Sequence, residues 1–289
     1  MGGGDHYSGT AFKLTHDSWT ERILYNFCSK PECGDGGSPQ GNLVSDKRGG
    51  LYGIGGVAFE LSRGPDGWKD TVLHDFTCGD GNGCEPYGLV MDPSGNLYGI
   101  TTSGGTSKEC GGGCGTAYEL QPMADGRWKQ RVLHQFGANN DNMAFPGGVL
   151  ILDNTGGLYG IAAGGTYRSG VVYRLSRGAG GEWKAAIQHN FTGGAGGDNP
   201  SGGLVMDKSG NLYGVTVYGG DSNCACGVVY KLSPSANGNG NTQRCTNSPA
   251  TTEPSPSPNS SSTTREISTA PPPPAARAAP AWPSNSRLS

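Results

Sequence analysis

Short runs of alternating apolar and polar residues, separated by turn residues, follow one another along most of the chain. One stretch contains four such runs, at 88–92, 97–101, 116–120 and 128–136. Val, Ile, Tyr and Leu dominate the runs, and Gly, Asp, Asn and Pro lie between them, which is typical of β-strands joined by hairpins. No longer segment has a helical period. The pattern therefore predicts an all-β chain.

The four-run pattern recurs as a module, and the triplet Leu-Tyr-Gly marks each copy. Its tyrosines, Tyr52, Tyr98, Tyr159 and Tyr213, lie 46, 61 and 54 residues apart. An aspartate and a turn precede each triplet, and an aromatic residue follows it. A tryptophan and a phenylalanine come next after the first three triplets, and one further pair, Trp19 and Phe27, lies before the first triplet. Repeats of this length are typical of propellers or arrays. We expect about four blades of four strands, with the aromatic residues between blades and each aspartate hydrogen-bonded to its turn.

The two ends of the repeat fall inside a module. The first copy begins at its third strand, 10–15, and the last ends at the equivalent strand, 227–233. The run from Trp19 to Phe27 could supply the outer strand of the last blade, which would leave fewer exposed strand edges. The start within a repeat also suggests an incomplete propeller from a shortened chain.

Composition divides the chain in two. Glycine accounts for 53 of 289 residues, which fits many tight turns between short strands. We assign residues 1–236 to the β-propeller-like repeat domain. Residues 237–289 are rich in Pro, Ser, Thr and Ala and are expected to be a disordered tail, either a linker or stalk or an unnatural reading-frame extension.

Charge and hydropathy exclude two partner classes. The net charge is −3 and basic residues are scattered, so we expect no nucleic-acid partner. No apolar run is long enough to span a membrane, and no signal-peptide core is visible at the start. Oligomeric state stays open.

Eight of the nine cysteines form close pairs in loops. The spacing predicts local disulfides and an extracellular or cell-surface location. Zinc is the alternative, but these spacings do not match the usual paired ligands. The candidate pairs are Cys28 and Cys33, Cys78 and Cys84, Cys110 and Cys114, and Cys224 and Cys226.

Repetition argues against the most obvious catalytic candidates. His74, His134 and His189 occupy one module position, which Tyr25 fills in the first copy. A catalytic base is needed once, so this ring of histidines is interpreted as structural. Residues facing a central channel, such as Asn42, Glu85, Tyr87 and Asn199, are too generic to single out. We assign no catalytic, cofactor-binding or metal-binding residue and expect no cofactor.

Several segments together resemble a known family, the GloVer tandem repeat. They are Gly-Thr-Ala-Phe-Lys-Leu at 9–14, Val-Leu-His-Asp-Phe at 72–76, Pro-Tyr-Gly-Leu-Val-Met-Asp at 86–92 and Gly-Asn-Leu-Tyr-Gly at 95–99. The resemblance covers residues 9–233. It implies a propeller-like repeat of bacterial secreted or surface proteins described as having a choice of anchors, and it implies no established activity.

Two function classes follow. The leading hypothesis is a non-catalytic extracellular binding or interaction module, because many equivalent loops are present without one distinguished chemical cluster. Its partner would be a glycan or a surface protein. The alternative is a propeller enzyme, a lyase or hydrolase acting on a saccharide or lactone at the central channel. A truncated fragment without independent function is a third reading.

Overall fold

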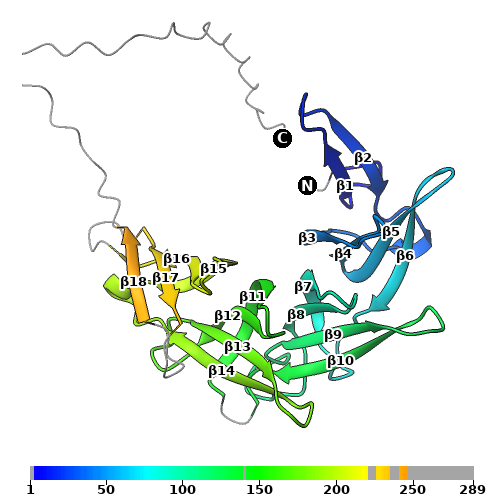
Figure 1. Cartoon of the computed structure of the whole chain (residues 1–289). Coiled ribbons are helices and arrows are strands. Elements are labelled where there is room, and N and C mark those ends of the chain that lie inside the picture. Colours follow the sequence, from blue (N-terminus) through cyan, green and yellow to red (C-terminus); the bar gives the residue numbers. More distant parts are fainter. Residues whose placement is uncertain (1–2, 139–140, 221–225, 235–240, 247–289) are drawn as a thin grey trace, which may run out of the picture. The chain divides into compact units, whose positions relative to one another are not determined.

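The computed structural model describes residues 3–138, 141–220, 226–234 and 241–246, the last of these by their backbone alone. Within these ranges the chain forms β-strands and two single-turn 3₁₀ segments, at Pro31–Cys33 and Gly194–Gly196. No helix in these ranges is long and apolar enough to cross a membrane. The prediction of an all-β chain is confirmed (Figure 1).

Five antiparallel groups of strands follow one another along the chain. The first sheet contains β1 (Thr10–Leu14) and β2 (Glu21–Asn26). The second contains β3 (Gln40–Ser45), β4 (Leu51–Gly55), β5 (Val57–Gly64) and β6 (Gly67–Asp75). The third contains β7 (Cys84–Met91), β8 (Leu97–Ser103), β9 (Thr116–Pro122) and β10 (Trp128–Gln135). The fourth contains β11 (Met143–Leu152), β12 (Leu158–Gly164), β13 (Val171–Arg177) and β14 (Trp183–Asn190). The fifth contains β15 (Asp198–Met206), β16 (Leu212–Tyr218), β17 (Val229–Ser233) and β18 (Asn241–Thr246).

Neighbouring sheets meet through their first strands. β3 contacts β7, β7 contacts β11, and β11 contacts β15 (Figure 1). The last pair also shares a parallel bridge between Val149 and Gly203. Four-stranded sheets that contact through equivalent first strands are the arrangement of propeller blades. The predicted β-propeller-like architecture of about four blades is therefore confirmed.

The outer strand of the last sheet differs from the prediction. The run from Trp19 to Phe27 was expected to complete this sheet, but its strand β2 pairs with β1. β18 pairs with β17 instead. A segment that follows β17 directly in sequence closes a short loop and so loses less chain entropy than a strand from the other end of the chain. β18 lies within the predicted tail, and residues 247–289 lie outside the described part, so the division at residue 236 stays a prediction.

The Leu-Tyr-Gly triplet places three different side chains by strand alternation. Leu97 packs in the cluster shared with the preceding sheet, and Tyr98 packs in the cluster shared with the following one. Gly99 lies on the same face as Leu97, where a Cβ atom would collide with the ring of Tyr118. The glycine is therefore required because the aromatic ring of the neighbouring strand lies over it. Gly53, Gly160 and Gly214 lie in the same way beneath Phe59, Tyr173 and Tyr230.

Each of these rings also contacts a phenylalanine from the preceding sheet. Phe76 follows β6 and lies 4.9 Å from Tyr118, measured between ring centroids. Both side chains belong to the apolar cluster between these sheets. The repeated phenylalanines therefore pack between blades, as predicted. The equivalent contacts are Phe27 with Phe59, Phe136 with Tyr173 and Phe191 with Tyr230.

The repeated aspartates cap the turns between the first two strands of each module. The Oδ1 atom of Asp92 accepts hydrogen bonds from the backbone N–H groups of Ser94 and Asn96, at 2.8 and 2.9 Å. The hydroxyl of Tyr98 donates to its other oxygen at 3.2 Å. Asp46, Asp153 and Asp207 bind their turns in the same way. The prediction that each aspartate hydrogen-bonds the backbone of its turn is confirmed.

Replacing Tyr118 with Phe should leave stability unchanged or raise it by up to about 1 kcal/mol. The Tyr118 hydroxyl is buried and has no hydrogen-bond partner among the described residues, and Phe59 fills the equivalent position in the second sheet. The control is Tyr98→Phe, which removes hydrogen bonds to Asp92 and Glu119 and should lose about 1 kcal/mol. Urea unfolding measures both. Equal losses in the two variants would contradict the prediction.

Gly99→Ala should reduce the free energy of unfolding by about 1–3 kcal/mol, because the added methyl group overpacks the site beneath Tyr118. Gly147→Ala provides the control, since a Cβ atom there meets nothing within 4 Å. Urea unfolding of the two variants should separate them. A Gly99→Ala protein as stable as the Gly147→Ala protein would show that the ring of Tyr118 leaves room for a methyl group at this position.

Candidate functional site

One position in each module combines an unusual backbone with an exposed side chain. It directly precedes the repeated proline at the start of the first strand. Its residue has a positive φ in all four copies, although none of them is glycine. A positive φ is sterically unfavourable for a residue with a side chain and most unusual before proline. All four side chains are exposed. The four residues are Ser38 (φ 49°), Glu85 (φ 56°), Phe145 (φ 48°) and Asn199 (φ 58°).

At three of the four positions, Ser38, Phe145 and Asn199, contacts between modules hold this backbone. The N–H group of Phe145 donates to the carbonyl of Cys114 in the preceding module, at 2.8 Å. Pro146 then lies against Gly115, where any Cβ atom would collide with the proline ring. The N–H groups of Ser38 and Asn199 make equivalent bonds to Ser8 and Ser169. The scaffold thus fixes the backbone and leaves the choice of side chain free.

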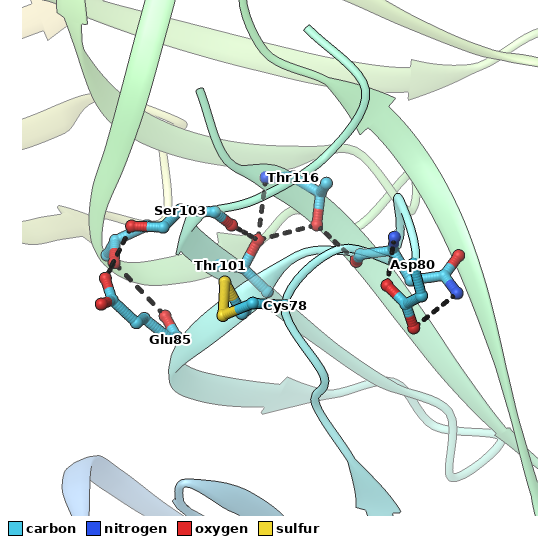
Figure 2. The surroundings of a disulfide bond; sticks show 9 residues. Cys78, Asp80, Glu85, Thr101, Ser103 and Thr116 are labelled. Atoms are coloured by element: carbon cyan, nitrogen blue, oxygen red, sulfur yellow. Dashed lines mark hydrogen bonds between the residues drawn. A yellow bond between two sulfur atoms is a disulfide. The ribbon is translucent and has the colours of Figure 1, made fainter. Parts of the chain in front are cut away.

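Glu85 carries the only carboxylate among these four side chains. The hydroxyl of Ser103 donates to its Oε2 atom at 2.6 Å, and the hydroxyl of Thr102 donates to the same atom at 3.0 Å. Figure 2 shows Glu85 and Ser103 beside the disulfide that begins at Cys78. These two hydrogen bonds, that from Ser103 foremost, lower the pKa of the Glu85 carboxyl below its usual value. The carboxylate is therefore ionised at neutral pH.

The loop before Glu85 is fixed at several points. A disulfide joins Cys78 to Cys84, the residue directly before Glu85. Asp80 caps the loop by accepting from the N–H group of Asn82 at 2.8 Å. The buried hydroxyl of Thr116 donates to the carbonyl of Asn82 at 3.1 Å (Figure 2). Glu85 is thus held by a rigid support rather than by a free loop.

Glu85 borders a small cleft between the second and third sheets. The cleft has a volume of about 340 Å³. Glu85 is the one ionisable group among the described residues that line it, and the hydroxyls of Ser38 and Thr102 and the amide of Gln40 supply neutral hydrogen-bonding groups. Its lining residues are Gly37, Ser38, Gln40, Gly56, Glu85, Pro86 and Thr102. The cleft therefore offers one negative charge surrounded by neutral donors and acceptors.

The other three candidates from the sequence have different surroundings from those of Glu85. The side chain of Asn42 links β3 to β7, since its amide donates to the carbonyl of Leu89 at 3.1 Å and its oxygen accepts from the N–H group of Leu89 at 3.3 Å. Tyr87 packs against an apolar cluster. Asn199 is exposed at the position equivalent to Glu85. The structure therefore distinguishes Glu85, which the sequence left among four generic residues.

A larger hollow lies at the opposite ends of the first strands. Its volume is about 1150 Å³, and the turns that follow β3, β7 and β11 line it. The carboxylates of Asp46, Asp92 and Asp153 lie here, but each already caps its own turn. Apolar side chains such as Val90, Met91 and Leu204 form much of the remaining wall. Lys47 and Arg48 also line this hollow, so it offers basic groups, while its three carboxylates are engaged in their turns.

The repeated histidines pack against neighbouring rings. His74 and His189 each lie edge-on to the following phenylalanine, with ring centroids 4.7 Å apart. His134 makes the same contact with Phe136, and its Nε2 atom lies 2.7 Å from a carboxylate oxygen of Asp141. Each histidine belongs to a different sheet and has its own surroundings, which fits a structural role.

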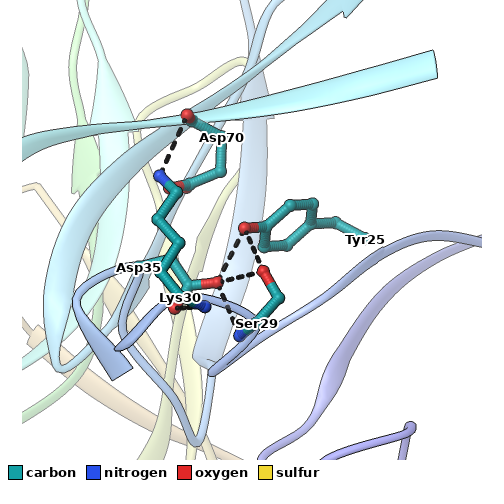
Figure 3. A network of polar contacts seen from close by, with 5 residues as sticks. All are labelled: Tyr25, Ser29, Lys30, Asp35 and Asp70. Atoms are coloured by element: carbon teal, nitrogen blue, oxygen red, sulfur yellow. Dashed lines mark hydrogen bonds and ion pairs between the residues drawn. The ribbon is translucent and has the colours of Figure 1, made fainter. Parts of the chain in front are cut away.

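Tyr25 fills the histidine position in the first module and belongs to a buried polar network. Its hydroxyl donates to Asp35 at 2.7 Å, and the backbone and side chain of Ser29 donate to the same carboxylate oxygen (Figure 3). Burial raises the pKa of Asp35, but these hydrogen bonds outweigh burial and hold it well below its usual range. Lys30 donates to the fully buried Asp70 at 2.9 Å. This network ties the loop after β2 to β6.

Three of the predicted cysteine pairs are disulfides in the structure: Cys28–Cys33, Cys78–Cys84 and Cys110–Cys114. Cys226 is also disulfide-bonded, and Cys224 lies outside the described residues. The sulfur atoms of the three pairs are therefore not available as thiolate ligands for zinc. Within the described ranges, no group of three or more His, Cys, Asp or Glu side chains is placed to hold a metal ion.

Comparison with known families matches residues 54–257 to the Gloeobacter/Verrucomicrobia repeat. The chain belongs to the Gloeobacter/Verrucomicrobia repeat family. The resemblance drawn from the Leu-Tyr-Gly modules is thereby confirmed. No curated protein matches the chain.

Several solved structures are similar to this repeat protein. A luciferin-regenerating enzyme is 16% identical, with a TM-score of 0.37, over 71% of this chain and 76% of the enzyme. An endo-arabinase from Bacteroides thetaiotaomicron is 13% identical, with a TM-score of 0.41, over 72% and 80%. A β-fructofuranosidase from Bombyx mori is 11% identical, with a TM-score of 0.42, over 71% and 47%.

These comparisons correct the leading functional hypothesis. The sequence favoured a non-catalytic binding module, whereas the similar solved structures are enzymes. They agree better with the alternative, a propeller enzyme. At these identities and TM-scores, no activity or substrate is carried over to this chain.

Stability should fall as the pH is lowered from about 7.5 to about 5.5, because burial lowers the pKa values of His74 and His189 in the folded chain. Below the unfolded pKa of about 6.5, the unfolded chain binds protons that the folded chain does not, so protonation favours unfolding. His189→Phe keeps an aromatic ring beside Phe191 and should reduce this pH dependence in urea unfolding.

The control is His16→Phe, because the His16 side chain is 96% exposed. It should leave the difference in unfolding free energy between the two pH values unchanged. A His189→Phe protein with the full wild-type pH dependence would show that this buried histidine does not couple folding to protonation.

Proposed function

We propose that this chain is a saccharide hydrolase in which Glu85 is the catalytic carboxylate. The observation that carries the proposal is the chemical difference among the four equivalent positions before the prolines. Positions needed for folding hold the same kind of residue in every copy, as the Leu-Tyr-Gly glycines do. The pre-proline position holds Ser, Glu, Phe and Asn on one strained and exposed backbone. Strain of this kind gathers at functional sites.

The ionisation of Glu85 favours hydrolysis of a glycosidic bond. Cleavage of that bond passes through a transition state resembling an oxocarbenium ion, whose positive charge a carboxylate stabilises or captures as a nucleophile. The leaving oxygen would take its proton from water, and a second water molecule would complete the hydrolysis. Hydrogen bonds from Ser103 and Thr102 lower the pKa of Glu85, so it is poised in the charged form. They also orient the carboxylate before the substrate arrives.

The same ionisation disfavours the lyase form of the enzyme hypothesis. A lyase must remove a proton from carbon, and a carboxylate with a lowered pKa is a weak base for that step. The carbanion would also need a positive group nearby, and the described residues that line the cleft include no Lys or Arg. Glycoside hydrolysis needs neither of these.

The surroundings of Glu85 fit a neutral, hydroxyl-rich substrate. Ser38, Gln40 and Thr102 offer uncharged donors and acceptors to sugar hydroxyls, and Gly37 and Gly56 leave room beside them. Phe145, at the equivalent position of the next first strand, exposes an aromatic ring on which a sugar face can stack. These groups support a saccharide over a charged or strongly apolar ligand.

We infer that the protein acts outside the cell, as a bacterial secreted or surface protein. Three disulfides in short loops support this location, since such bonds persist in oxidising compartments. Glycans of cell walls or of the surroundings would be the accessible substrates there.

The test is hydrolysis of a panel of aryl glycosides, whose good leaving groups need little help from a general acid. Wild-type protein should release the aryl alcohol, and Glu85→Gln should lower kcat by at least about a hundredfold. In Glu85→Ala, added azide should restore turnover by replacing the missing carboxylate. Ser103→Ala removes a hydrogen bond that lowers the pKa of Glu85, so the acid limb of the pH profile should move to higher pH.

The control is Glu182→Gln, because Glu182 is an exposed carboxylate in the hairpin between β13 and β14. Its activity should equal that of the wild type. Absence of hydrolysis across the panel would overturn the proposed function. Unchanged activity in Glu85→Gln would overturn the assignment of Glu85.

A further inference from the structure

Every complete sheet has two chemically distinct faces, one toward the preceding sheet and one toward the following sheet. In the third strand, Tyr118 and Leu120 of β9 pack in the cluster shared with the preceding sheet. Ala117 on the same strand packs in the cluster shared with the following sheet. Because strand residues alternate between faces, this division recurs in β5, β13 and β17. The contacts between sheets are therefore directional.

The first sheet exposes the face that elsewhere meets a preceding sheet. We call this the leading face, formed by the side chains of Phe12, Leu14, Trp19 and Ile23, which are 45–71% exposed. At the positions equivalent to Phe12 and Leu14, the second sheet has Phe59 and Leu61, both fully buried. The leading face is therefore an interface surface without its usual cover in the described part of the chain.

The last sheet exposes the opposite face. We call this the trailing face, formed by the side chains of Val205, Val215 and Val229, which are 43–69% exposed. Ile100 is equivalent to Val215, and Ala117 is equivalent to Val229. Both are fully buried against the following sheet. The trailing face is the counterpart to which a leading face is complementary.

The chain already contains the contact that such faces form. Between the second and third sheets, Ile54 and Ala58 pack against Tyr118 and Leu120. At the edge of the same contact, Tyr52 lies 6.0 Å from Trp128, measured between ring centroids. On the trailing face, Val215 and Val229 are equivalent to Ile54 and Ala58. On the leading face, Phe12 and Leu14 are equivalent to Tyr118 and Leu120.

We propose that the leading face of one copy of this chain docks on the trailing face of a second copy. Phe12 and Leu14 would cover Val215 and Val229, and Trp19 would take the place that Trp128 holds within the chain. Such a contact joins two different surfaces, so it repeats head to tail and does not end at a symmetric dimer. The first sheet has only two strands, so the interface is smaller than those within the chain and the association depends on concentration.

Sedimentation velocity of the full chain over a range of concentrations tests the proposal. The wild type should form dimers and larger species as concentration rises. Trp19→Asp places a charge in the leading face and Val229→Asp places one in the trailing face. Each variant alone therefore lacks one of the two surfaces that must meet, and it should stay monomeric. Mixed together, they keep one intact face each and should form a 1:1 dimer. Either substitution should weaken association by about tenfold or more, as expected at the centre of an interface.

Tyr167→Asp is the matched control, because Tyr167 is exposed in the loop between β12 and β13, away from both faces. It should associate like the wild type. If thermal unfolding shows that either face variant is misfolded, Ile23→Asp and Val205→Asp replace the pair. A wild type that stays monomeric at every concentration would overturn the proposal. Pairing of the two faces within one chain would give this result. A mixture that stays monomeric would overturn the head-to-tail arrangement.

Discussion

The structure depends on an aromatic ring that lies over the glycine of each Leu-Tyr-Gly triplet. Tyr118 covers Gly99 within its own sheet and receives Phe76 from the sheet before it. The glycine allows the ring to lie flat on the strand, and the phenylalanine fills the space between the two sheets. Each module thus needs its neighbour to bury its largest side chains, which is the general condition for stability in stacked repeats. The module is therefore not a unit that folds by itself.

This constraint gives the most conspicuous recurring residues a structural role. The turn aspartates, the Leu-Tyr-Gly tyrosines and the histidines before the phenylalanines all hold the modules together. Function requires a position where the scaffold fixes the backbone without fixing the side chain. The residue before each proline has a positive φ, and at Ser38, Phe145 and Asn199 a hydrogen bond to the preceding module holds that backbone. Glu85 is the one acidic residue among the four positions before the prolines.

The same directional packing has a consequence at the two ends of the repeat. Among the described residues, the leading face of the first sheet and the trailing face of the last sheet have no covering sheet. Phe12 at one end and Val229 at the other are apolar for the same reason that their buried equivalents are. Exposed apolar surface of this kind marks a site of association, since water is a poor solvent for it. The proposed self-association and the proposed catalysis therefore use different parts of the module.

The sequence by itself determined the modules, their strands, the turn aspartates and three of the four local cysteine pairs. These depend on residues close together in the chain, so alternation, turn residues and spacing were sufficient to predict them. Only the tertiary structure decided which strand completes the last sheet, because β2 and β18 have no sequence feature that ranks them as partners of β17. It also distinguished Glu85 from Asn42, Tyr87 and Asn199. The positive φ of Glu85 is a feature of the folded backbone, and its hydroxyl partners Thr102 and Ser103 come from the neighbouring strand, 17 and 18 residues away.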